Sequence, residues 1–204
     1  MGSKFLASVV VLTLTVACTT STPTGEPGVT QEGRWRVWYK GPLAAVEVGY
    51  VWAEKHLGDE WLVLKVGIAG AGTPIPVMRD GIRLFTPQGH QVEPLDQSAF
   101  RSVEGSLRMG LDRINAWQGP SSRFMSTRRP CGRWFITPPF PDQAGWLGER
   151  ASFETVYPSR QVVCGGPLVF DPPVGVQPGR WVLVIELEEG EARIPLKIEG
   201  PRTE

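Results

Sequence analysis

The sequence has little of the chemistry on which metalloproteins and many enzymes depend. Its 204 residues include only two histidines and three cysteines, which leaves little material for a metal site or a catalytic triad. An excess of charge of one sign is also lacking, because 21 basic residues balance 21 acidic ones. Binding nucleic acid through its phosphates needs a basic face, so we predict that nucleic acid is not a partner.

Glycine and proline, by contrast, are abundant, with 24 and 19 copies. These residues interrupt helices and favour short strands joined by turns. Hydrophobic residues make up 41% of the chain, and eight residues are tryptophan, which is enough to fill a core and excludes a wholly disordered protein. The length fits one domain, or one domain with a large insertion.

An export signal is predicted at the N-terminus. Lys4 supplies a positive charge, and residues 5–17 form an uncharged run of 13 apolar and small residues. A helix of this length is too short to cross a hydrocarbon core of about 30 Å. We therefore interpret residues 1–17 as a signal peptide.

The end of this leader, Leu14-Thr15-Val16-Ala17-Cys18, resembles the lipobox of bacterial lipoproteins. In that family a small residue precedes a cysteine that is acylated, for example with palmitate, and becomes the new N-terminus. The resemblance implies that Cys18 is the lipid anchor, although Thr15 departs from the leucine that is common there. An ordinary secretory signal peptide with an incidental cysteine is the alternative. Because residue 19 is not aspartate, the lipoprotein sorting rule implies the outer membrane, facing the periplasm, if the source has two membranes.

The segment behind Cys18 is expected to be a flexible tether. Residues 19–31 contain Val29 as their one aliphatic residue and are otherwise mostly Thr, Pro, Gly and Ser. Such a composition buries little apolar surface. We therefore predict a lipidated tether over residues 18–32 and a folded domain over residues 33–200.

With Cys18 used by the lipid, Cys131 and Cys164 remain. An even number of cysteines in an exported chain predicts a disulfide, and closing a loop of 33 residues would contribute roughly 3–4 kcal/mol. A zinc site is the alternative, but neither cysteine has a Cys or His partner at ligand spacing. We expect no metal and no cofactor, and we interpret His56 and His90 as solvated loop residues.

Apolar and polar residues alternate with the period of a β-strand in two parts of the chain. Strands are predicted at residues 34–40, 45–52, 61–68, 81–85, 90–95, 152–157, 161–170, 181–187 and 191–198. A hairpin turn is predicted at residues 86–89, and the last hairpin, after residue 187, is the clearest signal. Trp35, Trp52 and Trp181 are expected to lie in the core.

Between these parts the period changes. Apolar residues recur every three or four positions, which predicts an amphipathic helix over residues 96–117: Phe100, Val103, Leu107, Leu111, Ile114 and Trp117. Residues 118–150 are rich in Pro, Gly, Arg and Trp and are expected to form a long loop. We interpret residues 97–150 as an insertion between the strands.

The late strands, residues 166–173 followed by residues 180–185, are similar to those of the small immunoglobulin-like domains displayed by many bacterial lipoproteins. This resemblance implies a mainly β fold, an immunoglobulin-like antiparallel β-sandwich with an inserted α-helix and long loop. It also implies an extracytoplasmic interaction module, since that family has no shared catalytic residues.

The rest of the sequence favours binding over catalysis. No Gly-x-Ser-x-Gly elbow is present, and the carboxylates at residues 186–191 are interpreted as a solvated hairpin tip. We therefore predict that the protein is not an enzyme but an interaction or structural module of the cell envelope, with a protein or glycan partner. Candidate partner-binding residues lie in the insertion: Trp134, Phe135, Trp146, Arg128 and Arg129.

Three alternatives remain for the insertion and its aromatic residues. They could cap an open end of the sandwich. They could form a carbohydrate- or cell-wall-binding surface, because flat aromatic rings dock sugars and proteins. An envelope hydrolase is the least favoured reading, because it needs an acid or base pair that the sequence does not display.

Overall fold

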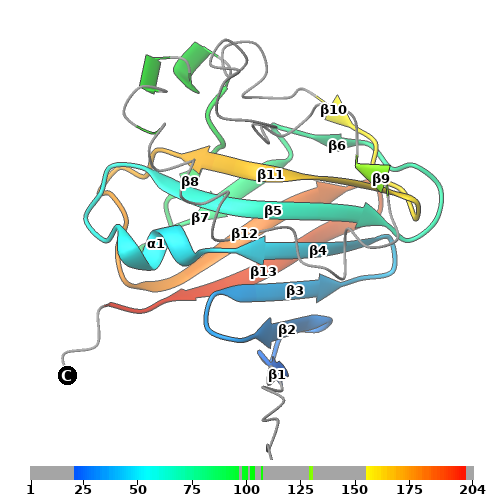
Figure 1. The fold of residues 1–204 in the computed structure, drawn as a ribbon, viewed down its shortest axis with the longest axis horizontal. Helices are drawn as coiled ribbons and strands as arrows, with labels where there is room; N and C mark the ends of the chain where they lie inside the picture. The colour runs from blue at the N-terminus through cyan, green and yellow to red at the C-terminus, as the bar shows by residue number, and fades with distance from the viewer. Residues whose placement is uncertain are drawn as a thin grey trace, which may run out of the picture.

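The computed structural model describes residues 21–96, 98–100, 102–103, 107, 129–130 and 155–200. This part of the chain is mainly β-structure, arranged in three sheets (Figure 1). The prediction of a mainly β, antiparallel fold is confirmed. Within the described residues, no helix is long and apolar enough to cross a membrane.

The larger sheet has seven strands, in the spatial order β1 (Ser21–Pro23), β2 (Val29–Glu32), β3 (Arg36–Lys40), β4 (Ala44–Gly49), β5 (Leu62–Gly70), β11 (Val162–Phe170) and β9 (Arg129–Pro130). The smaller sheet has four strands, in the order β13 (Gly190–Ile198), β12 (Gly179–Leu187), β7 (Ile82–Phe85) and β8 (Gln91–Val92). A short ladder pairs β6 (Val77–Met78) with β10 (Thr155–Val156). All of these pairings are antiparallel except that of β9 with β11.

The two sheets face each other across one apolar core. In Figure 1, β12 and β13 pass behind β4 and β5. Side chains from both sheets meet between them and are almost fully buried: Val46, Val48, Leu64, Ile68, Leu183, Ile185, Ile194 and Leu196. Trp181 is fully buried there as predicted, and its indole N–H donates to the carbonyl of Gln177 at 2.9 Å.

The hairpins follow the sequence pattern closely. β12 pairs with β13 along its whole length, from Gly179 opposite Ile198 to Leu187 opposite Gly190. The inward side chains of β13 are those that the alternation predicted. The second predicted hairpin, β7 with β8, also forms, and its turn is closed by the Gly89 N–H donating to the Thr86 carbonyl at 2.9 Å.

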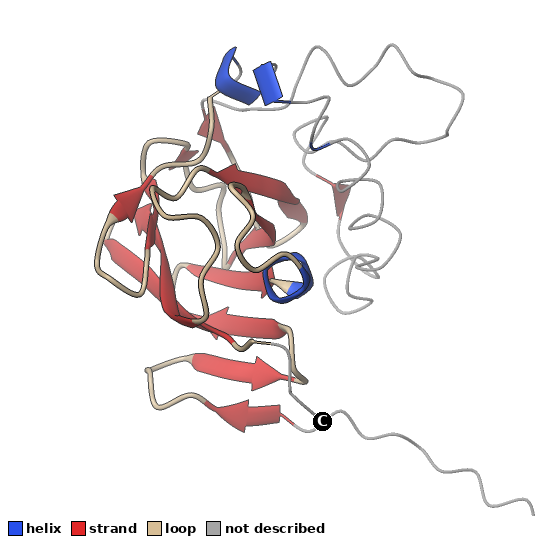
Figure 2. Ribbon diagram, turned by 90° about the vertical axis from the view of Figure 1, so that its left-hand side faces the viewer, coloured by secondary structure: helices blue, strands red, loops and turns tan. Residues whose placement is uncertain are grey.

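Two tryptophans expected in strand faces lie elsewhere. The strand predicted over residues 45–52 ends at Gly49, and a short helix, α1 (Val51–Lys55), follows it at the end of the sandwich that faces the viewer in Figure 2. Trp52 therefore sits on a helix. Trp35 precedes β3 in the turn after β2 and is 37% exposed. Alternation over so few residues does not separate strand from a following turn or helix.

The expected tether also differs from the structure. β1 and β2 form a hairpin on the edge of the larger sheet, and Val29 is 3% exposed. Gly25 and Gly28 both have positive φ, 85° and 72°, which suits a tight turn. The amino-acid composition did not predict this hairpin, because the hairpin is held by backbone pairing with β3 rather than by a large apolar surface of its own.

The described part of the predicted insertion is small. Residues 98–100, 102–103 and 107 have helical backbone, and Asp96 accepts a hydrogen bond from the Ala99 N–H at 2.7 Å through its side chain. That contact has the form of an N-cap, and the helix over residues 96–117 stays a prediction. The remaining residues of 97–150, apart from β9, lie outside the described residues.

Candidate functional site

Most of the predicted site residues lie outside the described part of the chain. This is so for Cys18, Arg128, Trp134, Phe135 and Trp146. The backbone of Arg129 is described in β9, opposite Val162.

The cysteine of β11 is engaged. Cys164 is fully buried in the core between the sheets and is disulfide-bonded. Cys131 itself lies outside the described residues, but its neighbour Pro130 stands opposite Val163, the neighbour of Cys164. Adjacent strands lie about 4.8 Å apart, a separation that suits the Cα atoms of a disulfide. The register therefore favours Cys131 as the partner, which remains a prediction.

The outer face of the larger sheet, which points away from the smaller sheet, carries a second apolar cluster. Val63 of β5 and Val169 of β11 are buried there by Phe100 and Leu107. Further residues pack around them: Trp52, Trp61, Leu95 and Val103. The first turns of the predicted insertion thus dock on this face.

Charged residues lie beside that cluster on the same face. The guanidinium of Arg36 is 2.9 Å from the Glu47 carboxylate and 3.8 Å from that of Glu32. Glu32 also accepts from the Trp38 indole N–H at 2.6 Å. Burial lowers the pKa of the neighbouring Lys65, and the Glu47 carboxylate only partly offsets that effect. Because both carboxylates are satisfied, this group of charges holds strands together rather than presenting a free acid or base.

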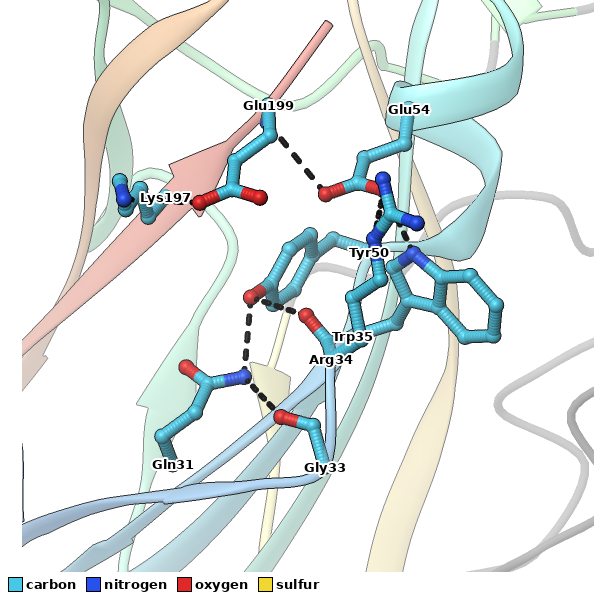
Figure 3. A network of polar contacts seen from close by, with 8 residues as sticks. All are labelled: Gln31, Gly33, Arg34, Trp35, Tyr50, Glu54, Lys197 and Glu199. Carbon is cyan, nitrogen blue, oxygen red and sulfur yellow. Dashed lines mark hydrogen bonds and ion pairs between the residues drawn. The ribbon is translucent and has the colours of Figure 1, made fainter. Parts of the chain in front are cut away.

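A polar cluster that the sequence did not reveal holds the turn between β2 and β3 (Figure 3). At its centre the Glu54 side chain, on α1, is only 4% exposed. Its Oε2 accepts from the Trp35 indole N–H at 2.6 Å and lies 2.9 Å from the Arg34 Nε. Its Oε1 accepts from the backbone N–H of Glu199 at 3.3 Å. One carboxylate therefore joins the turn, α1 and the C-terminal end of β13.

Tyr50 completes this turn cluster. Its hydroxyl donates to the Arg34 carbonyl at 2.8 Å and accepts from the Gln31 side-chain amide at 3.0 Å. Burial is the main reason that the pKa of Tyr50 is raised to about 12. The hydrogen bond from Gln31 opposes that shift, and the nearby carboxylate of Glu54 adds to it. Tyr50 is thus a neutral donor that fixes the backbone of the turn.

The turn cluster presents two side chains to solvent. The Trp35 ring is partly exposed, and the Arg34 guanidinium lies 5.5 Å from its centre, within the range of a cation–π contact. The side chains of the cluster hold one another and the backbone of the turn in place. Its geometry suits a rigid, exposed contact surface. The sequence placed Trp35 in a strand, and nothing near Glu54 pointed to its role.

Two of the other predicted polar sites, His56 and the β12–β13 tip, are paired rather than simply solvated. His56 stacks on Trp52 with 3.4 Å between ring centres, and its Nδ1 is 2.8 Å from the Asp59 carboxylate. At the β12–β13 tip, Glu191 lies 2.6 Å from Arg83 and 3.1 Å from Arg193. His90 is exposed, as expected. No cluster of three or more His, Cys, Asp or Glu suited to a metal ion occurs in the part of the chain that the structure describes.

Comparison with known proteins identifies no relative: no family model, no curated protein and no solved structure matches the chain.

Proposed function

We propose that the protein is a lipid-anchored protein of the bacterial cell envelope that serves as a non-catalytic interaction or structural module. The observation that carries this proposal is the leader: an uncharged run of 13 residues that ends in Ala17-Cys18. A disulfide-bonded Cys164 supports export, because disulfides persist in oxidising compartments. In a source with two membranes, the proposed location is the periplasmic face of the outer membrane.

We also propose that the sandwich is immunoglobulin-like, with residues 97–150 as its insertion. Two antiparallel sheets around a single core support this. The docking of Phe100 and Leu107 on the outer face supports an insertion that begins against the larger sheet. The proposed partner, an envelope protein or glycan, would contact the insertion at Arg128, Arg129, Trp134, Phe135 and Trp146.

Labelling with palmitate tests the anchor. Expressed in a bacterial host, the wild type should incorporate labelled palmitate and sediment with membranes, whereas Cys18→Ser should do neither. Cys164→Ser is the matched control, because it also removes one cysteine but keeps the lipobox, and it should remain labelled. Label on Cys18→Ser, or none on the wild type, contradicts the proposal.

Substitutions in the insertion test the module. Trp134→Ala and Trp146→Ala should weaken the capture of envelope components while shifting the thermal midpoint by only a few degrees, as about 1 kcal/mol does in a domain of this size. If both variants melt far lower and bind no worse per folded molecule, these tryptophans are core residues instead.

A further inference from the structure

The turn cluster lies at the same end of the larger sheet as the start of the described chain. Ser21 of β1 stands opposite Glu32 of β2, and Glu32 stands opposite Arg36 of β3. These three residues form a row across the sheet. The turn that holds Arg34 and Trp35 extends beyond this row, and the chain that leads back from Ser21 to Cys18 leaves from the same row. In Figure 1 the β2–β3 turn, α1 and the C-terminal end of β13 all lie on the left.

Covalent geometry limits how far this end can be from Cys18. Ser21 is three residues after Cys18, and an extended chain spans at most about 3.3–3.6 Å per residue, or roughly 10–11 Å here. The headgroup layer of one leaflet is about 5–8 Å thick, which is half of the difference between the full bilayer and its hydrocarbon core. A lipid on Cys18 would therefore hold the row of Ser21 close to the outer boundary of the headgroups.

The side chains at this end match a headgroup layer. Trp35 is one of the few large hydrophobic residues that are exposed in the described structure, and tryptophan favours the interface between water and lipid. Three cationic side chains at this end are exposed: Arg34, Arg36 and Lys197, at 38%, 38% and 77%. The carboxylates of Glu54, Glu32 and Glu47 are largely buried, at 4%, 10% and 13%, whereas the Glu199 carboxylate is 36% exposed and lies 2.7 Å from the Lys197 ammonium. The exposed cations of this group outnumber its exposed carboxylates, which favours contact with lipid phosphates.

We propose that the Arg34–Trp35 turn docks on the phospholipid headgroups of the membrane that holds Cys18, as a second contact beside the lipid. This inference rests on the proposed acylation of Cys18. The lipid would supply the anchorage, and the second contact would serve to orient the sandwich on the membrane. The turn needs no rearrangement to dock, because Glu54 and Tyr50 already hold it.

Quenching of tryptophan fluorescence by brominated lipids tests the contact. The acylated full-length product is reconstituted in vesicles of phosphatidylethanolamine and phosphatidylglycerol, with and without bromine on the upper acyl chain. The difference between wild type and Trp35→Phe isolates the signal of Trp35. Trp38→Phe is the matched control, because Trp38 lies on β3, three residues or about 10 Å along the chain from Trp35, and its indole N–H donates to Glu32.

We expect bromine to quench the wild type and Trp38→Phe to a similar extent, and Trp35→Phe much less. Acrylamide in the aqueous phase should quench Trp35 less in vesicles than in detergent micelles. Equal quenching of wild type and Trp35→Phe overturns the docking, and so does an absence of bromine quenching in the wild type, which needs no variant to fold. In either case, palmitate on Cys18 and flotation of the protein with the vesicles would still support the lipid anchor. A wild type without acyl label overturns both proposals.

Discussion

The two faces of the larger sheet are built differently. On its inner face, alternate residues of β4 and β5 contribute to one continuous apolar core, as Val46 and Leu64 do, and Leu168 of β11 joins them. On its outer face, apolar residues form separate patches, one around Val63 and another around Ala69. Arg36, Glu47 and the partly buried Lys65 lie beside these patches.

The two faces differ in the kind of element that covers them. The inner face is completed by strands whose own alternation places them against it. The outer face is completed by residues that lie outside the strands, such as Trp52 on α1 and Phe100 in the insertion. We therefore expect the inner face to set the global stability of the fold and the outer face to open locally. The predictions that follow test this contrast, beginning with the largest effect.

Truncating one residue on each face should separate global from local unfolding. Leu183→Ala, in the inner core, should lower the free energy of unfolding by about 2–5 kcal/mol. Phe100→Ala should lower it less, because the outer cluster has four buried residues and can open while the sandwich stays folded. Urea unfolding measures the first effect, and amide hydrogen exchange over residues 98–107 measures the second. Equal losses of global stability, with unchanged exchange, would show a single cooperative unit.

Breaking the disulfide should loosen the link between the insertion and β11. If Cys131 pairs with Cys164, then Cys131→Ser and Cys164→Ser should each lose about 2–4 kcal/mol. The double variant should lose little more than either single one, because each removes the same bond. A non-reduced digest analysed by mass spectrometry should contain the two peptides linked. Free thiols at both positions in protein taken from the envelope would refute the pairing.

Removing one hydroxyl tests the turn cluster that lies beyond both faces. Tyr50→Phe should lower the free energy of unfolding by about 1–3 kcal/mol near neutral pH, because the Arg34 carbonyl loses its hydrogen-bond donor. Tyr39→Phe is the matched control: Tyr39 packs against the inner core without being fully buried, and its loss should cost less.

The raised pKa of Tyr50 adds a pH signature to this test. The folded state keeps the phenol neutral up to about pH 12, whereas the unfolded chain loses the proton near pH 10. The stabilisation that comes from the neutral Tyr50 phenol is complete below pH 10. It is lost between pH 10 and 12, where the free energy of unfolding falls by up to about 1.4 kcal/mol per pH unit. Urea unfolding at several pH values should therefore show the gap between wild type and Tyr50→Phe narrowing over that range. A constant gap would contradict the shifted pKa.

The same contrast explains what the sequence could predict. Alternation in β5 and β13 predicted their inward faces, because local pattern and tertiary burial agree there. It misplaced Trp35 and Trp52, since four or five alternating residues do not mark where a strand gives way to a turn or a helix. The β1–β2 hairpin was hidden because its order comes from backbone pairing. Glu54 gave no signal because its partners, Arg34, Trp35 and Glu199, come from distant parts of the chain.

The smallest expected effect concerns the charge on the outer face. Burial lowers the folded-state pKa of Lys65, so its positive charge is less favourable in the folded protein than in the unfolded chain. Lys65→Met should therefore raise the thermal midpoint slightly at neutral pH. Between the pKa of folded Lys65 and the unfolded value near 10.5, the folded protein has lost the lysine proton while the unfolded chain still binds it. The wild type therefore gains stability as the pH rises through this range, and the advantage of Lys65→Met shrinks. Lys40→Met, at an exposed position on β3, is the control for the replacement of a lysine by methionine on this sheet. A lower midpoint for Lys65→Met would mean that the pairing of this lysine with its surroundings outweighs its desolvation, and that the outer face is stabilised by its charges as the inner face is by its apolar residues.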